Sequence, residues 1–198
     1  MRLVLIAGMP GSGKTSVVKE CCQGREFAFI ANNEESAKMI DGMTEMIDSY
    51  PFKSPCARGR QLKYHVDNMA FRHPSIMISE PPGNCLEVSA PMLNPIYVSD
   101  KDRMQIGPLI TVMNGREILE NGISKSSSEG LRRWNMIDES DVIVMTFTDG
   151  MSDEVRRNLG NVIRRINPDA RILFFGQDNS KITDEIFGNS VYRRPLYN

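Results

Sequence analysis

The sequence has no long apolar run and no excess of either charge. No stretch approaches the roughly 18 consecutive apolar residues that a membrane-spanning helix needs, and no small-residue cleavage site of a signal peptide precedes Gly8. Lysine and arginine together number 24, against 25 aspartates and glutamates. This balance argues against a protein that gains its affinity by neutralising nucleic-acid phosphates. We therefore expect a cytoplasmic protein that binds neither a membrane nor a nucleic acid.

Residues that bind transition metals are also scarce, with 4 cysteines, 2 histidines and no C-x-x-C pair. Cytoplasmic cysteines are expected to be reduced thiols, so a special role for them would be metal ligation or redox sensing. The neighbours Cys21-Cys22 lie on a predicted helix and are expected to pack in the core. Cys56 and Cys85 fall instead in two proline-rich segments, residues 50–60 and 81–106, which predict loops or short irregular elements.

Apolar runs of strand length alternate with helical patterns along the chain. Continuous apolar runs are typical of strands that are covered on both faces of a sheet. Six such runs predict strands, at residues 3–7, 27–31, 76–79, 109–113, 142–147 and 171–175. The clearest helical pattern is Asp153–Asn167, because its apolar residues share one face, acidic residues occupy its first turn and Pro168 follows.

The strongest motif is a phosphate-binding loop (P-loop) at the end of the first predicted strand. Residues 8–15 read Gly8-Met9-Pro10-Gly11-Ser12-Gly13-Lys14-Thr15, which fits G-x(4)-G-K-[ST]. Glycines permit backbone conformations in which successive N–H groups point at a phosphate, and the N-terminus of the following helix adds partial positive charge. Lys14 is expected to reach the β- and γ-phosphates, and the Thr15 hydroxyl to contact Mg²⁺. The candidate nucleotide contacts are Gly8, Pro10, Gly11, Ser12, Gly13, Lys14, Thr15 and Ser16.

The phosphate loop and the alternation of predicted strands with predicted helices together predict one α/β domain. The expected architecture is the three-layer sandwich of P-loop proteins, with a mostly parallel central sheet and helices on both faces. A chain of 198 residues can bury one substantial core and is short for two ordinary domains. We therefore expect a single nucleotide-binding domain over residues 1–198.

Five further segments follow the phosphate loop in order: Phe27–Glu35, Ser54–Arg58, Ile76–Asn84, Val142–Asp149 and Ile166–Ile186. With these segments the sequence resembles, over nearly its whole length, the metallocenter-assembly GTPases of the HypB, UreG and CobW type. Phe27–Glu35 is similar to the family's second strand and Asn-Asp segment, Ile76–Asn84 to its E-x-x-G-N, and Val142–Asp149 to the strand leading into N-K-x-D. Ser54–Arg58 stands in the place of a cysteine-bearing metal motif, and Ile166–Ile186 in that of the last helix-strand-helix unit. The resemblance implies a slow, GTPase-like nucleoside triphosphatase that is a homodimer when loaded. It also implies delivery of a metal or metallocofactor to a client metalloenzyme or its accessory proteins.

The resemblance implies roles for individual residues as well. Glu80 would help Thr15 to hold Mg²⁺, and the N–H of Gly83 would sense the γ-phosphate. Cys56 and Cys85 would be ligands for a transition metal such as Ni²⁺ or Zn²⁺, although their spacing alone gives little support for a site. A packing role for both cysteines stays open, since isolated cysteines are often small core residues.

The sequence departs from the family where the base and the attacking water would bind. The guanine motif keeps only Asp149, and Gln177 stands in the loop where the family has a Ser-Ala-Lys-like sequence. Lost hydrogen bonds to a base cost about 1 to 3 kcal/mol each, so GTP is the leading ligand and ATP a serious rival. Asn33 replaces an aspartate, and an amide cannot act as a base, which predicts slow turnover or a substitute role for the next two glutamates. The candidate catalytic residues are thus Lys14, Glu80, Gly83 and Asn33.

Two other classes of protein stay open on the sequence alone. A small-molecule or nucleotide kinase uses the same phosphate loop, and Glu34 or Asp41 could activate its acceptor, but no compact arginine-rich lid is evident. A binding module or sensor that does not hydrolyse its nucleotide would fit the altered base and water positions.

Overall fold

A single parallel sheet forms the centre of the molecule. The computed structural model describes residues 1–49, 58–83, 88–100 and 102–193. The strands in this part are β1 (Arg2–Gly8), β2 (Ala28–Ala31), β3 (Ile47–Ser49), β4 (Ile76–Ser79), β5 (Gln105–Asn114), β6 (Val142–Thr146) and β7 (Arg171–Phe174). Across these described residues the sheet has seven strands in the order β3-β2-β4-β1-β5-β6-β7, and every pair is parallel.

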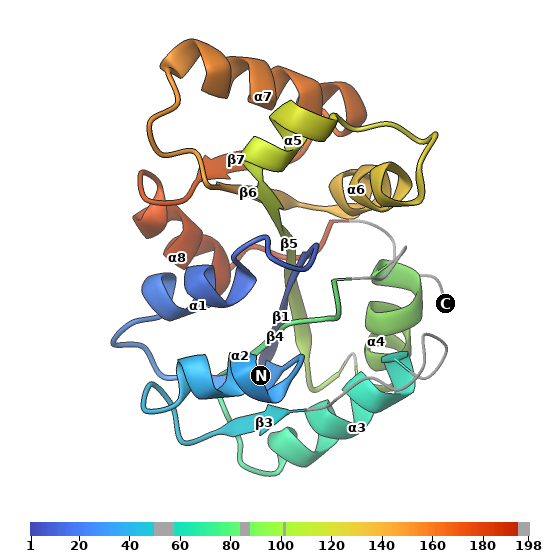
Figure 1. Ribbon diagram of the computed structural model, residues 1–198. Helices are drawn as coiled ribbons and strands as arrows, with labels where there is room; N and C mark the ends of the chain where they lie inside the picture. Colours follow the sequence, from blue (N-terminus) through green and yellow to red (C-terminus); the bar gives the residue numbers. More distant parts are fainter. Residues whose placement is uncertain (50–57, 84–87, 101, 194–198) are drawn as a thin grey trace.

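Helices cover both faces of this sheet. They are α1 (Lys14–Cys21), α2 (Glu34–Ile40), α3 (Arg58–Ala70), α4 (Asn94–Asp100), α5 (Gly115–Asn121), α6 (Ser128–Glu139), α7 (Asp153–Ile166) and α8 (Asn179–Phe187), with a π-helical turn η2 (Ser89–Leu93) before α4. Helices α1, α2 and α8 pack on one face, whereas α3, α4 and α6 lie on the other (Figure 1). Helix α7 packs with α5 and α6. The predicted three-layer α/β sandwich is confirmed.

Burial on both faces explains why the strands read as continuous apolar runs. Every residue of β1, β2, β4 and β6 is buried. Strand β5 is irregular in its pairing: its register against β1 shifts between Leu3 and Leu5. Gly107-Pro108 occupies the shifted stretch, and proline has no N–H to donate to the ladder. The irregularity therefore follows from the sequence of β5.

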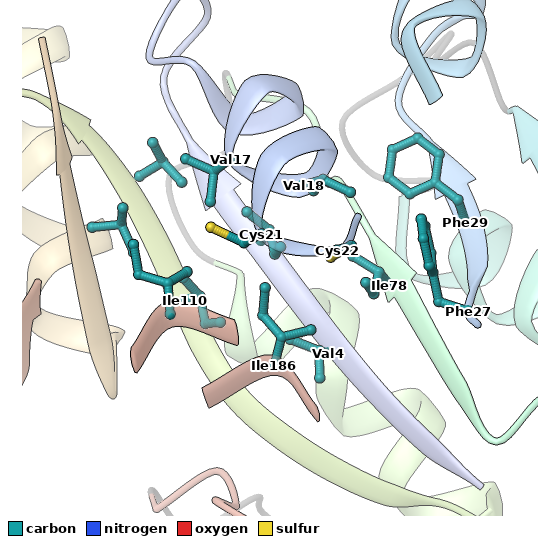
Figure 2. Close-up of a cluster of buried hydrophobic side chains, with 14 of the residues drawn as sticks. Val4, Val17, Val18, Cys21, Cys22, Phe27, Phe29, Ile78, Ile110 and Ile186 are labelled. Carbon is teal, nitrogen blue, oxygen red and sulfur yellow. The ribbon is translucent and has the colours of Figure 1, made fainter. Parts of the chain in front are cut away.

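The core beneath α1 anchors the helix that carries the phosphate loop. Val17 and Val18 of α1 meet Val4 of β1, Ile110 of β5 and Ile186 of α8 in one buried cluster (Figure 2). Because these side chains come from the centre of the sheet and from its last helix, the start of α1 is fixed relative to several strands at once.

Cys21 and Cys22 belong to the same cluster and are free thiols (Figure 2). Burial raises the pKa of Cys21 to about 12 and raises the pKa of Cys22 as well. Both side chains therefore stay protonated near neutral pH, and the prediction that they pack in the core is confirmed.

The expected strands differ from the structure in one missing strand and one wrong boundary. Strand β3 was not predicted, because its three half-buried residues are too short to produce an apolar run. Strand β5 begins at Gln105 rather than at 109, since Gly107-Pro108 hides its first part from the pattern.

The segment 88–100, expected to hold loops or short irregular elements, forms the π-helical turn η2 and the short helix α4. Met92, Leu93 and Ile96 of this segment pack against apolar residues of α3. Pro95 is the second residue of α4, which follows η2 without a break, and it has no N–H to donate to the preceding turn.

The other expected loop lies largely at 50–57, outside the described residues. Within the described ranges, no helix is long and apolar enough to cross a membrane. The assignment of 1–198 to one domain stays a prediction.

Candidate functional site

The phosphate loop joins the central strand β1 to the N-terminus of α1 and requires glycine at defined positions. A Cβ on Gly8 would lie 2.4 Å from the carbonyl oxygen of Val112 and 2.6 Å from Ser12 Oγ. Gly13 has a φ of 88°, a left-handed conformation that a residue with a Cβ adopts only under strain. The loop therefore has the tight backbone that lets its N–H groups converge on a phosphate.

Lys14 is folded back into this loop. Its Nζ donates to the carbonyl oxygens of Gly8 and Met9, at 3.0 Å each, and the residue is only 8% exposed. Burial lowers the pKa of Lys14, while the nearby carboxylate of Glu80 acts in the opposite direction. The ammonium group is thus held beside the loop by carbonyl groups that a more negative ligand, such as a phosphate, can displace.

Thr15 and Glu80 meet beside the loop. Thr15 Oγ1 donates to Glu80 Oε2 at 3.1 Å and lies 3.1 Å from Ser36 Oγ in the first turn of α2. Glu80 has no exposed surface, and burial raises its pKa, an effect that the Thr15 hydrogen bond and the charge of Lys14 partly offset. A buried carboxylate therefore lies at the carboxyl end of β4, next to the loop.

This oxygen cluster fits a Mg²⁺ ion. Glu80 Oε1 is buried and has no hydrogen-bond partner among the described residues. A buried carboxylate oxygen without a partner is costly, whereas a carboxylate and a hydroxyl are the hard oxygen groups that Mg²⁺ prefers, directly or through water. Thr15 and Glu80 are therefore brought together as the predicted magnesium site requires, although their role stays a prediction.

Gly83 touches the phosphate loop directly. A Cβ at this position would lie 2.6 Å from the Gly8 carbonyl oxygen, 2.6 Å from Pro10 N and 2.7 Å from Pro10 Cδ. Two of these atoms belong to the backbone and cannot move aside by a change of rotamer. Glycine is therefore needed at 83 for close approach of two backbones, and the segment after β4 and the phosphate loop constrain each other.

A cavity of 460 Å³ runs along these groups. A pocket of this size suits a small organic ligand such as a nucleotide. It brings together most of the predicted site residues, namely Pro10, Gly11, Gly13, Lys14, Thr15, Ser16, Asn33, Glu80 and Gly83. The predicted nucleotide contacts Gly8 and Ser12 belong to the loop that forms its wall.

The candidate catalytic residue Asn33 has a structural task. It is exposed, and its Oδ1 accepts a hydrogen bond from the N–H of Ser36 at 2.8 Å, which caps the N-terminus of α2. Glu35, two residues further on, also lines the cavity. An acidic side chain is thus available on this wall, while the Asn33 oxygen already serves as the helix cap.

The phosphate loop is also held near Ser12, by the last residue of β6. Thr146 Oγ1 donates to the carbonyl oxygen of Ser12 at 2.7 Å and to that of Met113 at 3.1 Å. Phe147 follows with a φ of 53° and lines the cavity. Thr146 therefore connects the phosphate loop to two strands, β5 and β6.

The predicted base contacts lie apart from this cavity. Asp149 is exposed, and its Oδ1 lies 4.0 Å from a Cβ built on Gly176, so the two loops are adjacent. Gln177 lines a different cavity of 290 Å³, together with Arg156 and Arg164 of α7. The structure thus places the Asp149 and Gly176 loops side by side, but does not bring Gln177 into the phosphate cavity.

Three residues of the site were missed by the sequence reasoning as functional groups: Ser36, Thr146 and Phe147. Ser36 could have been found from its place in the first turn after the Asn33 cap. Thr146 and Phe147 stand at the first two positions of the altered N-K-x-D, but their contacts with the phosphate loop could not be predicted, because they join residues more than 130 positions apart.

The candidate transition-metal ligands Cys56 and Cys85 lie outside the described residues. Among the residues that the structure does describe, no group of three or more histidine, cysteine, aspartate or glutamate side chains could hold a metal ion.

Comparisons with known proteins agree with this geometry. A family model described as the CobW/HypB/UreG nucleotide-binding domain matches residues 2–174. The hydrogenase maturation factor HypB from Archaeoglobus fulgidus is similar in structure, with a TM-score of 0.62, 14% identity, and coverage of 93% of this chain and 87% of that chain. HypB from Helicobacter pylori, solved in complex with nickel, has a TM-score of 0.62 and 14% identity, with coverage of 92% and 82%.

Zn(II)-bound YjiA GTPase from E. coli has a TM-score of 0.57 and 15% identity, with coverage of 100% of this chain and 67% of that chain. These identities establish likeness of fold alone. No curated protein matches the chain by sequence.

The contact between Gly83 and the loop predicts weaker nucleotide binding together with some loss of stability. Gly83→Ala is expected to weaken binding of a nucleoside triphosphate about tenfold, because overpacking of about 1 to 3 kcal/mol would push on the Gly8 and Pro10 backbone. Gly24→Ala is the control, since Gly24 has a φ of 72° and open space around it. It should lower stability by about 1 kcal/mol without changing affinity. Calorimetric titration and urea unfolding measure both; equal affinity for Gly83→Ala and wild type would contradict the prediction.

The buried carboxylate predicts an effect on magnesium binding and an effect on stability. Glu80→Gln should remove the Mg²⁺ dependence of nucleotide affinity. In the ligand-free protein it should lower the melting temperature, because the buried Lys14 ammonium loses the charge that partly offsets its own desolvation. Glu35→Gln, an exposed carboxylate on the same cavity, should leave stability unchanged. A Glu80→Gln protein that keeps the wild-type Mg²⁺ dependence would exclude this carboxylate from the ion site.

Proposed function

The chain belongs to the CobW/HypB/UreG family of nucleotide-binding domains, and on this premise we propose that it uses its nucleotide state to deliver a metal ion or metallocofactor to a client enzyme. It is a P-loop nucleoside triphosphatase of the GTPase type. The observation that carries the proposal is the arrangement of Lys14, Thr15 and Glu80 around one cavity at the carboxyl ends of β1 and β4.

Each of these residues has a task in binding the triphosphate. When nucleotide binds, the Lys14 ammonium exchanges two carbonyl partners for phosphate oxygens, which are more negative acceptors. Thr15 and Glu80 hold Mg²⁺, which neutralises phosphate charge when it is bound. Burial of Lys14 and Glu80 strengthens both interactions, since there is little water to screen them.

Gly83 is the point at which the triphosphate acts on the rest of the protein. The backbone of Gly83 touches Gly8 and Pro10. The position of a phosphate in the loop and the position of Gly83 therefore depend on each other. Coupling of a terminal phosphate to a neighbouring segment is what a nucleotide switch needs. This favours a switch over a small-molecule kinase, as does membership of the family.

The residues at the start of α2 that line the cavity suggest that hydrolysis is slow. Asn33 caps α2 and has no basic group, so water activation is left to the exposed Glu35 or to a group from another molecule. We infer that a second copy of the chain, or the client, completes the site. Such dependence on a partner keeps a switch loaded until it meets its target.

The cargo is proposed to be Ni²⁺ or Zn²⁺. Structures of a nickel complex of HypB and of zinc-bound YjiA support this class of ion for this chain. Cys56 and Cys85 are the proposed ligands, with two thiolates from each subunit of a homodimer giving four sulfur ligands. A cytoplasmic location is part of the same proposal.

Replacement of the loop lysine tests the nucleotide site. Lys14→Ala should weaken binding of GTP and ATP about 10- to 100-fold, because a charge-assisted contact with the phosphates is lost. Lys19→Ala, an exposed lysine on the same helix, should bind as wild type does. The measurement is calorimetry with Mg²⁺ present, followed by phosphate release and by incubation with a panel of small acceptors. Unchanged affinity in Lys14→Ala would overturn the nucleotide site, and phosphate transfer far faster than hydrolysis would replace the switch with a kinase.

Substitution of single cysteines tests the cargo. Titration with Ni²⁺ or Zn²⁺ should show a lower stoichiometry for Cys56→Ala and for Cys85→Ala than for wild type. Cys21→Ala is the matched control, because that thiol is buried and protonated near neutral pH, and it should leave the stoichiometry unchanged. Equal stoichiometry in all four proteins would remove Cys56 and Cys85 as ligands.

A further inference from the structure

We propose that Phe147 is the platform on which the nucleobase stacks, so that the site binds a purine nucleotide by its ring face and accepts GTP and ATP with similar affinity. This inference rests on the proposed nucleotide site and names the residue that determines its base preference.

The order of the strands gives the direction of the bound nucleotide. Glu80 and Gly83 follow β4, which flanks β1 on one side, whereas Phe147 follows β6, which lies on the opposite side beyond β5. If the terminal phosphate lies beside Glu80, the other phosphates of the nucleotide extend past Lys14 at the start of α1. The nucleoside then lies at the β6 end of the cavity. Helix α2 also lines the cavity. It follows β2, which lies beyond β4, so α2 is on the side of the terminal phosphate.

Phe147 is placed where such a base would arrive. Its ring lines the cavity, and ring atom Cε2 lies 3.7 Å from a Cβ built on Gly13 of the phosphate loop. The residue is 43% exposed, which leaves ring surface open to a ligand. Every base has a π face, so an aromatic platform contributes affinity without selecting one base.

The backbone holds this ring in place at a cost. Phe147 has a φ of 53°, which is unfavourable for a bulky side chain and is found mostly where function requires it. Thr146, directly before it, is fixed by hydrogen bonds to Ser12 and Met113. The strained conformation is therefore imposed by a segment that is anchored to the loop, and it places the aromatic ring over Gly13.

The groups beside Phe147 offer little to read the edge of a base. The hydroxyl proton of Thr146 is already directed to two backbone carbonyls, and Thr148 is buried. Asp149 is exposed and does not line the cavity. Because discrimination between purines comes from hydrogen bonds to their edges, a site that relies on stacking distinguishes them weakly.

Three ligands and two variants test the proposal. GTP, ATP and inorganic tripolyphosphate, each with Mg²⁺, are titrated into wild type, Phe147→Gly and Phe147→Trp. Glycine removes the ring and adopts a φ of 53° without strain, so the variant is expected to fold, which a melting curve checks. Wild type should bind GTP and ATP within about fivefold of each other, and Phe147→Gly should bind both about tenfold more weakly while binding tripolyphosphate as wild type does.

Phe147→Trp should keep the affinity and report stacking directly. In a Trp134→Phe background the introduced indole is the single tryptophan, since the chain has one. Its fluorescence should be quenched by GTP and ATP but not by tripolyphosphate. Unchanged nucleotide affinity in Phe147→Gly, or an equal loss for tripolyphosphate, would overturn the platform. Failure of wild type to bind any of the three ligands would instead overturn the nucleotide site itself.

Discussion

The site depends on two opposite charges that the fold buries at the ends of adjacent strands, the ammonium of Lys14 and the carboxylate of Glu80. Burial lowers the pKa of the first and raises the pKa of the second, and each charge partly relieves the other. Lys14 bonds to neutral carbonyls, and one oxygen of Glu80 has no hydrogen-bond partner among the described residues. In the proposed function a triphosphate and a divalent cation would supply the missing partners, so these two groups would gain most from binding.

The phosphate loop is held from two sides, and this links its two ends. Thr146 bonds to the Ser12 carbonyl on the β6 side, while Gly83 presses against Gly8 and Pro10 on the β4 side. A loop with both contacts cannot shift at one end without strain at the other, because packed interiors transmit small displacements. In the proposed binding mode, the nucleoside end and the terminal phosphate end of the ligand would therefore be coupled through the backbone of the phosphate loop.

Local sequence was enough to predict the features that depend on local chemistry. The spacing of glycines, Lys14 and Thr15 defined the phosphate loop, and apolar runs located the main strands because burial on both faces leaves a continuous pattern. Contacts made by distant segments left no such signal. The altered N-K-x-D includes Thr146 but gives no sign of its hydrogen bond to Ser12, and β3 is too short to show any period. Of the base contacts that the resemblance implies, Gln177 lines another cavity.

The contacts of its neighbours explain why Phe147 has an unfavourable backbone conformation. A bulky residue keeps a left-handed conformation only if its neighbours allow no cheaper arrangement. Here Thr146 is fixed to two carbonyls and Thr148 is buried, so Phe147 between them has no freedom to relax. Core side chains such as those beneath α1 supply the stability that tolerates this cost. The ring of Phe147 is 43% exposed and lies against Gly13 of the phosphate loop, so the unfavourable backbone conformation holds an aromatic face beside the cavity, as the proposed stacking of a base requires.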